Sequence, residues 1–302
     1  MSMYRFDGYT LLGRFQHPAS RRSKPGRSLV AAAFLAIPAS LCSAATNDVP
    51  DRVLHFAMDE IRANAFVDLI TSNAIGRVTN ARTTAQGKLG AACEFAAKNS
   101  YVQVADAPAL NPKQVTVSLW FKTDKTAGPP RTLLEKNAGQ GYALCLAGGG
   151  KENPRKGKLR AIVNGREILS DASVTDGLWH HAAVTYDGED LKLYVDGTLQ
   201  KQTAAMHGEV ASNSHDLTIG MNRSSPAAHE KEASFDGAID EVSLFKRALD
   251  AAEIKRLISS VKPKFTKQQV ERRLRELKEL RDRGLILQDF YDRKMQECEV
   301  VE

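Results

Sequence analysis

Cysteine is scarce in this chain, with four in 302 residues. Cys42 falls in the N-terminal segment discussed below, and the other three, Cys93, Cys145 and Cys298, form an odd set that does not build a disulfide framework. Alternation around Cys145 puts it on the strand face opposite to Leu144. We therefore interpret Cys93 and Cys145 as small buried apolar residues.

The chain also lacks an excess of positive charge beyond its first 45 residues. The formal net charge is +6, but residues 1–45 hold six basic residues against Asp7 alone, a surplus of five that leaves the rest of the chain at +1. Without a basic patch there is no electrostatic case for nucleic acid as a partner.

Residues 28–45 are an apolar run with Pro38 inside it and small residues at its end, directly after the basic segment. This pattern is typical of a signal peptide, predicted over residues 1–45 with cleavage after Ala44 or Ala45. An uncleaved anchor, a lipid anchor on Cys42 and a start of translation further along stay open as alternatives. The prediction is an exported protein that is periplasmic, extracellular or held at the cell envelope.

From residue 53 to residue 245 the pattern has no long helices and no phosphate-binding Gly-Lys-Ser/Thr loop. Short alternating segments are separated by Gly, Asn, Asp and Pro, which indicates an all-β chain with antiparallel strands. Asp187-Gly188 and Asp196-Gly197 predict two hairpins in succession. The predicted strands are 53–58, 92–95, 101–104, 115–123, 132–136, 142–147, 158–163, 179–186, 191–195, 198–203, 217–221 and 238–245.

Helices are predicted only after the last strand. Asp250 and Glu253 form a capping box for a short helix with Ile254 and Leu257 on its apolar face. Residues 261–302 are charge-rich and predict a helical hairpin interrupted at Gly284. Such a hairpin is too small to bury a core alone, so self-association through residues 266–297 is expected. The predicted units are 1–45, 46–260 and 261–302.

Several segments occur in the order typical of bacterial laminin-G-like jelly-roll domains: 87–95, 101–104 with 109–112, 115–121, 179–188, 193–197, and 235–242 with 247–249. The chain resembles this family over residues 51–260. The resemblance implies a concanavalin A-like, two-sheet antiparallel jelly-roll sandwich whose usual role is binding. Residues 274–286, with Tyr291 and Lys294, resemble the short C-terminal domain called SHOCT, which implies a role in oligomerisation.

The Glu-x-Asp-x-x-Glu motif of the fold's glucanase members is absent from the sequence. Asp240 and Glu241 are neighbours on a predicted strand, so alternation points them to opposite faces and disfavours a catalytic pair. The same reasoning separates His180 from His181 and argues against a shared metal ion. The two tryptophans, Trp120 and Trp179, alternate with apolar residues and are interpreted as core residues.

Calcium is a candidate cofactor, because related domains often hold this ion at the rim of the sandwich. Asp59 at the end of the first strand and Asp240 in the last are the predicted ligands, since carboxylate oxygens suit calcium. Solvated rim carboxylates are the alternative. We expect that the protein is not an enzyme and that it is a binding module for a glycan or a cell-surface protein. The alternative hypotheses are a glycan hydrolase or lyase and a scaffold component.

Overall fold

The computed structural model describes residues 49–96, 98–126, 128–137, 139–149, 152–223, 234–260 and 267–284, with residues 288 and 291. The predicted signal segment and most of the predicted second tail helix lie outside the described residues. No helix in these ranges is both long enough and apolar enough to cross a membrane.

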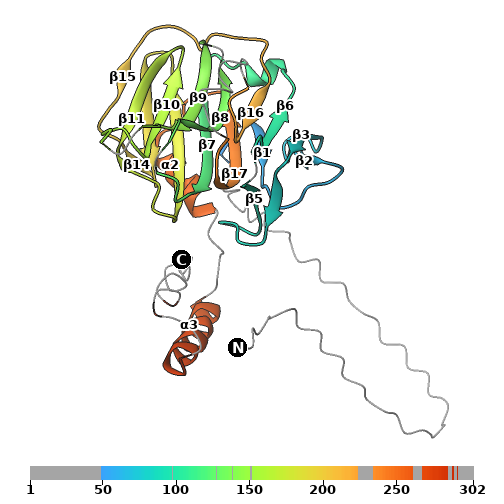
Figure 1. The fold of residues 1–302 in the computed structure, drawn as a ribbon, viewed down its shortest axis with the longest axis vertical. Helices are drawn as coiled ribbons and strands as arrows, with labels where there is room; N and C mark the ends of the chain where they lie inside the picture. Colours follow the sequence, from blue (N-terminus) through green and yellow to red (C-terminus); the bar gives the residue numbers. More distant parts are fainter. Residues whose placement is uncertain are drawn as a thin grey trace, which may run out of the picture. The chain divides into compact units, whose positions relative to one another are not determined.

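Two antiparallel sheets make up the described fold, as the sequence predicts (Figure 1). Sheet A has nine strands in the described chain, with β7 and β17 at its centre. Its strands are β1 (Arg52–Phe56), β4 (Arg82–Thr84), β5 (Ala92–Phe95), β7 (Val115–Lys122), β12 (Trp179–Tyr186), β13 (Asp190–Val195), β14 (Thr198–Leu199), β15 (Ala204–Ala205) and β17 (Gly237–Phe245). Seven of them run in the order β14-β13-β12-β7-β17-β5-β4, while β1 pairs with β17 and β15 with β13.

Sheet B has eight strands among the described residues, in the order β11-β10-β9-β8-β16-β6-β3-β2. They are β2 (Ala65–Val67), β3 (Ala74–Thr79), β6 (Tyr101–Val104), β8 (Arg131–Asn137), β9 (Gly141–Leu146), β10 (Lys158–Val163), β11 (Arg166–Ser173) and β16 (Leu217–Ile219). A single 3-10 turn, η1 (Pro108–Leu110), is described between β6 and β7.

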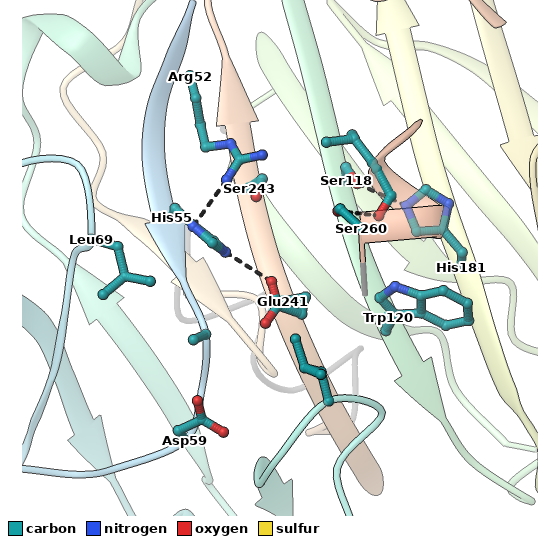
Figure 2. Close-up of a pocket in the computed structure, with 13 residues that line it drawn as sticks. Arg52, His55, Asp59, Leu69, Ser118, Trp120, His181, Glu241, Ser243 and Ser260 are labelled. Atoms are coloured by element: carbon teal, nitrogen blue, oxygen red, sulfur yellow. Dashed lines mark hydrogen bonds and ion pairs between the residues drawn. The ribbon is translucent and has the colours of Figure 1, made fainter. Parts of the chain in front are cut away.

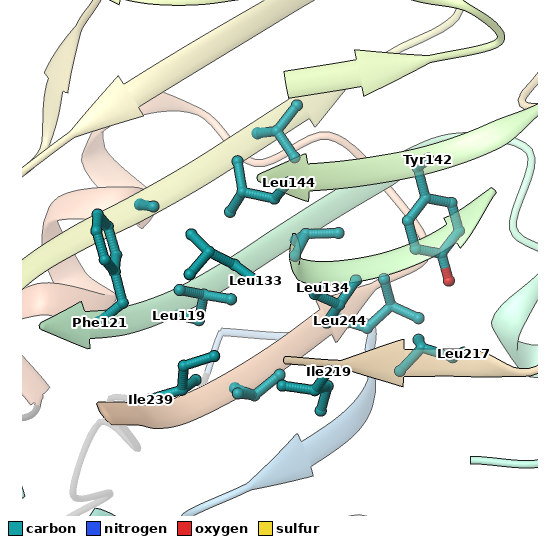
Figure 3. Packing of buried hydrophobic residues seen from close by; sticks show 14 of the residues in the cluster. Leu119, Phe121, Leu133, Leu134, Tyr142, Leu144, Leu217, Ile219, Ile239 and Leu244 are labelled. Carbon is teal, nitrogen blue, oxygen red and sulfur yellow. The ribbon is translucent and has the colours of Figure 1, made fainter. Parts of the chain in front are cut away.

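The hydrophobic core fills the space between the sheets (Figure 3). Leu119 and Phe121 of β7 reach it from sheet A, and Leu144 of β9 and Ile219 of β16 reach it from sheet B. Burying each such side chain contributes about 1.5–3 kcal/mol, so this layer favours alternation in strands such as β7. Residues between the core positions of β7, such as Trp120, therefore point away from the core.

The two Asp-Gly hairpins are confirmed. At the second, Asp196 and Gly197 have φ values of 50° and 75°, and β12, β13 and β14 pair in succession as antiparallel neighbours. The sequence prediction missed the short strands β2, β3, β4 and β15 and the eight-residue β11. The predicted strand 198–203 is wrong beyond Leu199, where β14 ends.

Helix α2 (Ala251–Ser260) covers part of the outward face of sheet A. Its capping box is confirmed: the Glu253 amide donates to Asp250 Oδ1 at 2.8 Å, and the Asp250 amide donates to Glu253 Oε2 at 3.1 Å. Ile254 and Leu257 pack against Phe245 of β17. The helix therefore ends with its last turn on the outward face of the sheet.

Helix α3 (Lys267–Asp282) begins the tail. Gly284 has a φ of 67°, and its amide donates to the Arg281 carbonyl at 2.8 Å, a left-handed termination that confirms the predicted stop. The SHOCT resemblance and the domain boundaries stay predictions.

Candidate functional site

A pocket of about 360 Å³ opens on the outward face of sheet A, beside the last turn of α2. Strands β1, β7, β12 and β17 form its floor, and the segments after β1 and before β5 complete its sides (Figure 2). The lining residues are Arg52, His55, Ala57, Asp59, Leu69, Leu89, Ser118, Trp120, His181, Glu241, Ser243, Leu257 and Ser260.

One wall is built by β7 and β12, which place Trp120 directly opposite His181 in the strand register. The two rings meet edge to face, with centroids 5.3 Å apart. Ser118 Oγ lies 2.9 Å from His181 Nε2. Trp120 Nε1 and His181 Nδ1 are buried and have no hydrogen-bond partner within the described chain. Buried polar atoms rarely stay unpaired, so each marks a position for a ligand atom or water.

Burial lowers the pKa of His181 to about 4. The imidazole is therefore uncharged at neutral pH. Its pairing with Ser118 resembles the first two members of a nucleophile, base and orienting-acid arrangement. The third member is lacking among the described residues, because Nδ1 has no partner there.

The opposite wall is a chain of three side chains from β1 and β17 (Figure 2). Arg52 Nη1 donates to His55 Nδ1 at 3.0 Å, and His55 Nε2 lies 2.8 Å from Glu241 Oε2. Because the guanidinium can only donate, His55 Nδ1 accepts and Nε2 carries the proton that is donated to Glu241. His55 is thus a neutral link between a cation and a carboxylate.

A β-bulge in β17 gives Glu241 its position. Four residues of β17, Asp240 to Ser243, lie opposite only three of β7, Trp120 to Ser118, and Glu241 has a φ of 51°. The extra residue brings Glu241 to the outward face that Asp240 already occupies. The prediction that Asp240 and Glu241 point to opposite faces is therefore wrong, because strict alternation does not survive a bulge.

Residues 87–91, here called the strap, form a tight turn over this face. Asp240 Oδ2 accepts the amides of Lys88 and Leu89 at 2.7 and 3.0 Å, and Asp59 Oδ1 accepts the amide of Ala91 at 2.7 Å. Gly90 has a φ of 69°, and a Cβ there would lie 2.4 Å from Asp59 Oδ1. The two aspartates therefore anchor the strap, which contributes Leu89 to the pocket.

The pKa of Asp240 is raised to about 7: burial is the largest cause, the nearby Glu241 carboxylate adds to it, and hydrogen bonds from main-chain amides oppose it. Its side chain is fully buried. Both oxygens accept amide hydrogen bonds, since Oδ1 takes the Glu241 amide at 2.9 Å. Asp240 is consequently a structural anchor and does not face the pocket directly.

The structure brings the predicted calcium ligands, Asp59 and Asp240, to the same strap, where both accept amide hydrogen bonds. Within the described ranges, no group of three or more His, Cys, Asp or Glu residues is placed to hold a metal ion. Calcium binding at these two residues stays a prediction.

The structure confirms some of the other sequence interpretations and corrects others. His180 and His181 do point to opposite faces, and His180 hydrogen bonds Asp196 and Asp176 at 2.8 and 3.0 Å. Trp120 is buried, as expected, but it lines the outward pocket and lies outside the core between the sheets. Cys93 is an apolar core residue, and burial raises the pKa of its thiol.

Cys145 is buried on the face opposite Leu144, as predicted, although Arg160 Nε lies 3.1 Å from its sulfur. Sequence reasoning missed the roles of Arg52, His55 and Glu241 in the pocket. The detectable signal was polar residues at the outward positions of strands whose alternate positions are apolar.

The profile of the concanavalin A-like lectin/glucanases superfamily matches residues 96–255. The chain belongs to this superfamily. A curated relative, the Sushi, von Willebrand factor type A, EGF and pentraxin domain-containing protein 1 of Rattus norvegicus, is 32% identical over 103 residues, which is 32% of this chain. The Mus musculus protein of the same name matches equally. The chain spans only 3% of the length of these relatives.

Solved structures share the fold at low sequence identity. Domain 4 of AbnA, a GH43 extracellular arabinanase from Geobacillus stearothermophilus in complex with arabinotriose, has a TM-score of 0.53 and 19% identity, covering 68% of this chain and 98% of that one. The ligand binding domain of botulinum neurotoxin serotype D, in complex with N-acetylneuraminic acid, has a TM-score of 0.51 and 16% identity, covering 70% and 51%. The binding domain of Paraclostridial Mosquitocidal Protein 1 has a TM-score of 0.52 and 16% identity, covering 70% and 52%.

Proposed function

We propose that this protein is an exported, non-catalytic binding module that recognises a glycan through the pocket on sheet A. The observation that carries the proposal is the pair of buried polar atoms, Trp120 Nε1 and His181 Nδ1, that have no partner in the described chain. A sugar hydroxyl both donates and accepts hydrogen bonds, so hydroxyl groups match the chemistry of both atoms. The volume of about 360 Å³ is in the range of sites for small ligands.

The structural relatives support this direction. One was solved with arabinotriose and another with N-acetylneuraminic acid, and the arabinanase is extracellular. Export of this chain is proposed from the signal segment at residues 1–45 together with these relatives. The tail, residues 266–297, is proposed to mediate self-association.

Binding is favoured over hydrolysis by the state of the acidic residues. Glycoside hydrolysis requires one carboxyl group to protonate the leaving oxygen and a second to act as nucleophile or base. Asp240 is fully buried, with both oxygens occupied by main-chain amides, and Glu241 accepts a hydrogen bond from His55. Asp240 therefore has no oxygen free to change partners during a reaction, which leaves Glu241 without a matched second carboxyl group on β17.

A glycan array with the purified protein, followed by calorimetry on the glycans that bind, tests the proposal. Ser118→Ala and Glu241→Gln change pocket groups and should weaken binding about tenfold, whereas Glu209→Gln, at an exposed residue outside the pocket lining, should leave it unchanged. Release of reducing ends from any bound polysaccharide would favour the hydrolase alternative. Binding of cell-surface proteins but of no glycan would contradict the glycan assignment.

Calcium is proposed as a cofactor only through Asp59 and Asp240. Calorimetric titration with calcium, and glycan binding with and without a chelator, test this part separately. Binding that is lost in Asp59→Asn would support the site. Glycan binding that is unaffected by the chelator, with no heat of calcium binding, would remove calcium from the proposal.

A further inference from the structure

The Lys88 side chain contacts Trp120, one of the residues that line the pocket. Its ammonium nitrogen is 4.3 Å from the centroid of the Trp120 ring, a cation–π contact. The strap delivers this contact, since the main-chain amide of the same residue donates to Asp240. A positively charged group of the protein itself is thus in contact with the Trp120 ring, which lines the pocket.

The surroundings of Trp120 suit a cation better than an anion. Two acidic residues line the pocket here, Glu241 beside Trp120 and Asp59 near the strap. The nearest pocket imidazole, His181, is uncharged at neutral pH. Arg52 is directed to the far wall, where it donates to His55 and stacks 5.2 Å from the Phe245 ring.

Glu241 adds an available acceptor. His55 occupies Oε2, and no described residue hydrogen bonds to Oε1. The lining of the pocket thus includes a carboxylate oxygen and an aromatic residue, the two kinds of group that best stabilise an ammonium ion after desolvation. An acidic sugar would meet these same carboxylates with repulsion.

We propose that Lys88 is an internal substitute for the ligand and that the pocket takes a glycan carrying a free amino group, an unacetylated amino sugar whose ammonium displaces Lys88 from Trp120. This inference rests on the glycan-binding function proposed above. The strap stays in place during the exchange, because its bonds to Asp59 and Asp240 come from main-chain amides and survive rotation of the Lys88 side chain.

Calorimetry on the full protein at pH 6 with a glucosamine tetramer and an N-acetylglucosamine tetramer tests the inference. We expect the free amine to bind and the acetylated sugar to bind at least tenfold more weakly. Lys88→Ala removes the competing cation and should tighten amine binding about two- to thirtyfold, whereas Lys88→Arg should resemble the natural protein. Lys98→Ala, an exposed lysine beyond the strap, is the matched control.

The two tryptophans allow a direct optical readout. In Trp179→Phe the remaining Trp120 is the sole reporter, and we expect its emission to change when the glucosamine tetramer is added. Trp120→Phe keeps an aromatic ring and should retain part of the affinity, whereas Trp120→Leu should lose it. Thermal unfolding checks that each variant folds. If Trp120→Leu does not fold, Lys88→Ala still tests the inference.

The outcomes separate the two proposals. Equal or tighter binding of the acetylated tetramer, or no effect of Lys88→Ala on amine binding, would overturn the inference while glycan binding itself stands. Lysine-rich peptides that bind more tightly than the amino sugar would also overturn it, in favour of a protein ligand. If neither tetramer nor any arrayed glycan binds, the glycan-binding function fails, and the inference fails with it.

Discussion

Lys136 is a fully buried lysine on β8 whose ammonium is surrounded by oxygen atoms. It donates to Asp106 Oδ1 at 2.7 Å and to the carbonyls of Asn213 and His215 at 2.9 and 2.6 Å. Its hydrogen bond lowers the pKa of Asp106. The lysine therefore ties residues 213–215 to the end of the sandwich as an internal cation.

Replacing this ammonium with an apolar group should destabilise the fold. In Lys136→Met the two carbonyls and the Asp106 carboxylate lose their charged donor, which costs roughly 1–3 kcal/mol of unfolding free energy. Urea unfolding followed by circular dichroism measures the change. Lys113→Met, at an exposed lysine paired with Glu209, is the control and should be indistinguishable from the natural protein. Equal stability of both variants would contradict the structural role of Lys136.

Gly90 is a residue for which two constraints can be separated by experiment. Gly90→Ala introduces a side chain at a φ of 69° and places its Cβ against Asp59, whereas Gly139→Ala at a φ of 85° meets nothing within 4 Å. Both should lose about 1 kcal/mol or more through backbone strain. Only Gly90→Ala should also weaken glycan binding, because it displaces the strap. Equal effects of both variants on binding would show that the strap does not shape the pocket.

At the scale of elements, the strands that were predicted correctly carry a clear alternation of apolar residues. β5, β6, β10 and β12 have the predicted bounds because each has core positions two residues apart. The missed β11 begins after Asn164-Gly165, whose φ values of 46° and 77° form a hairpin turn. That turn signal was present in the sequence. β2 and β4 have only three residues each, too few for a detectable pattern.

The bulge at Glu241 was not predictable from the pattern. Asp240, Glu241 and Ser243 all lie outward, while Val242 reaches the core. Nothing in the sequence indicates where a non-glycine residue takes a positive φ, because the surrounding pairing with β7 imposes it. Local strain of this kind near a pocket is typical of functional sites.

The strap should respond to pH through Asp240. When the strap is closed, burial holds the pKa of Asp240 at about 7, and opening to water lets it fall towards its ordinary value of about 4. The closed strap therefore binds the proton more tightly, and opening becomes more favourable as pH rises from about 4 to about 7. Glu241 is a charged neighbour that acts on this carboxyl, while Lys88 and Asp59 contribute to the same strap contacts.

Amide hydrogen exchange at Lys88 and Leu89 measures the response. After correction for intrinsic exchange, protection should fall at least about tenfold between pH 5 and pH 8, and Asp240→Asn should abolish the dependence. The amide of Asn164, which donates to the Gly141 carbonyl at 2.8 Å in a distant turn, is the internal control. Protection that rises with pH would contradict the assignment to Asp240.

At the scale of the whole molecule, the pocket draws on residues nearly 210 positions apart, from Arg52 to Ser260. The sequence identified the sandwich and placed Asp59 near Asp240, since the first and last strands of such folds adjoin. It did not place Trp120 beside His181 or His55 beside Glu241, because these contacts depend on the pairing register of β7, β12, β1 and β17. The pocket is thus a property of tertiary structure.

Self-association through the tail is a prediction at the same scale. In α3, Leu274, Leu277 and Leu280 are spaced three residues apart, and Leu280 is 37% exposed. A single amphipathic helix of 16 residues cannot bury a core of its own, so a second copy of the chain is the expected partner. Leu280→Glu should shift the protein towards monomer in analytical ultracentrifugation over a range of concentrations. Lys278→Gln, at an exposed position, lowers the net charge by the same amount and should leave the oligomeric state unchanged. A natural protein that is monomeric throughout that range would contradict self-association through the tail.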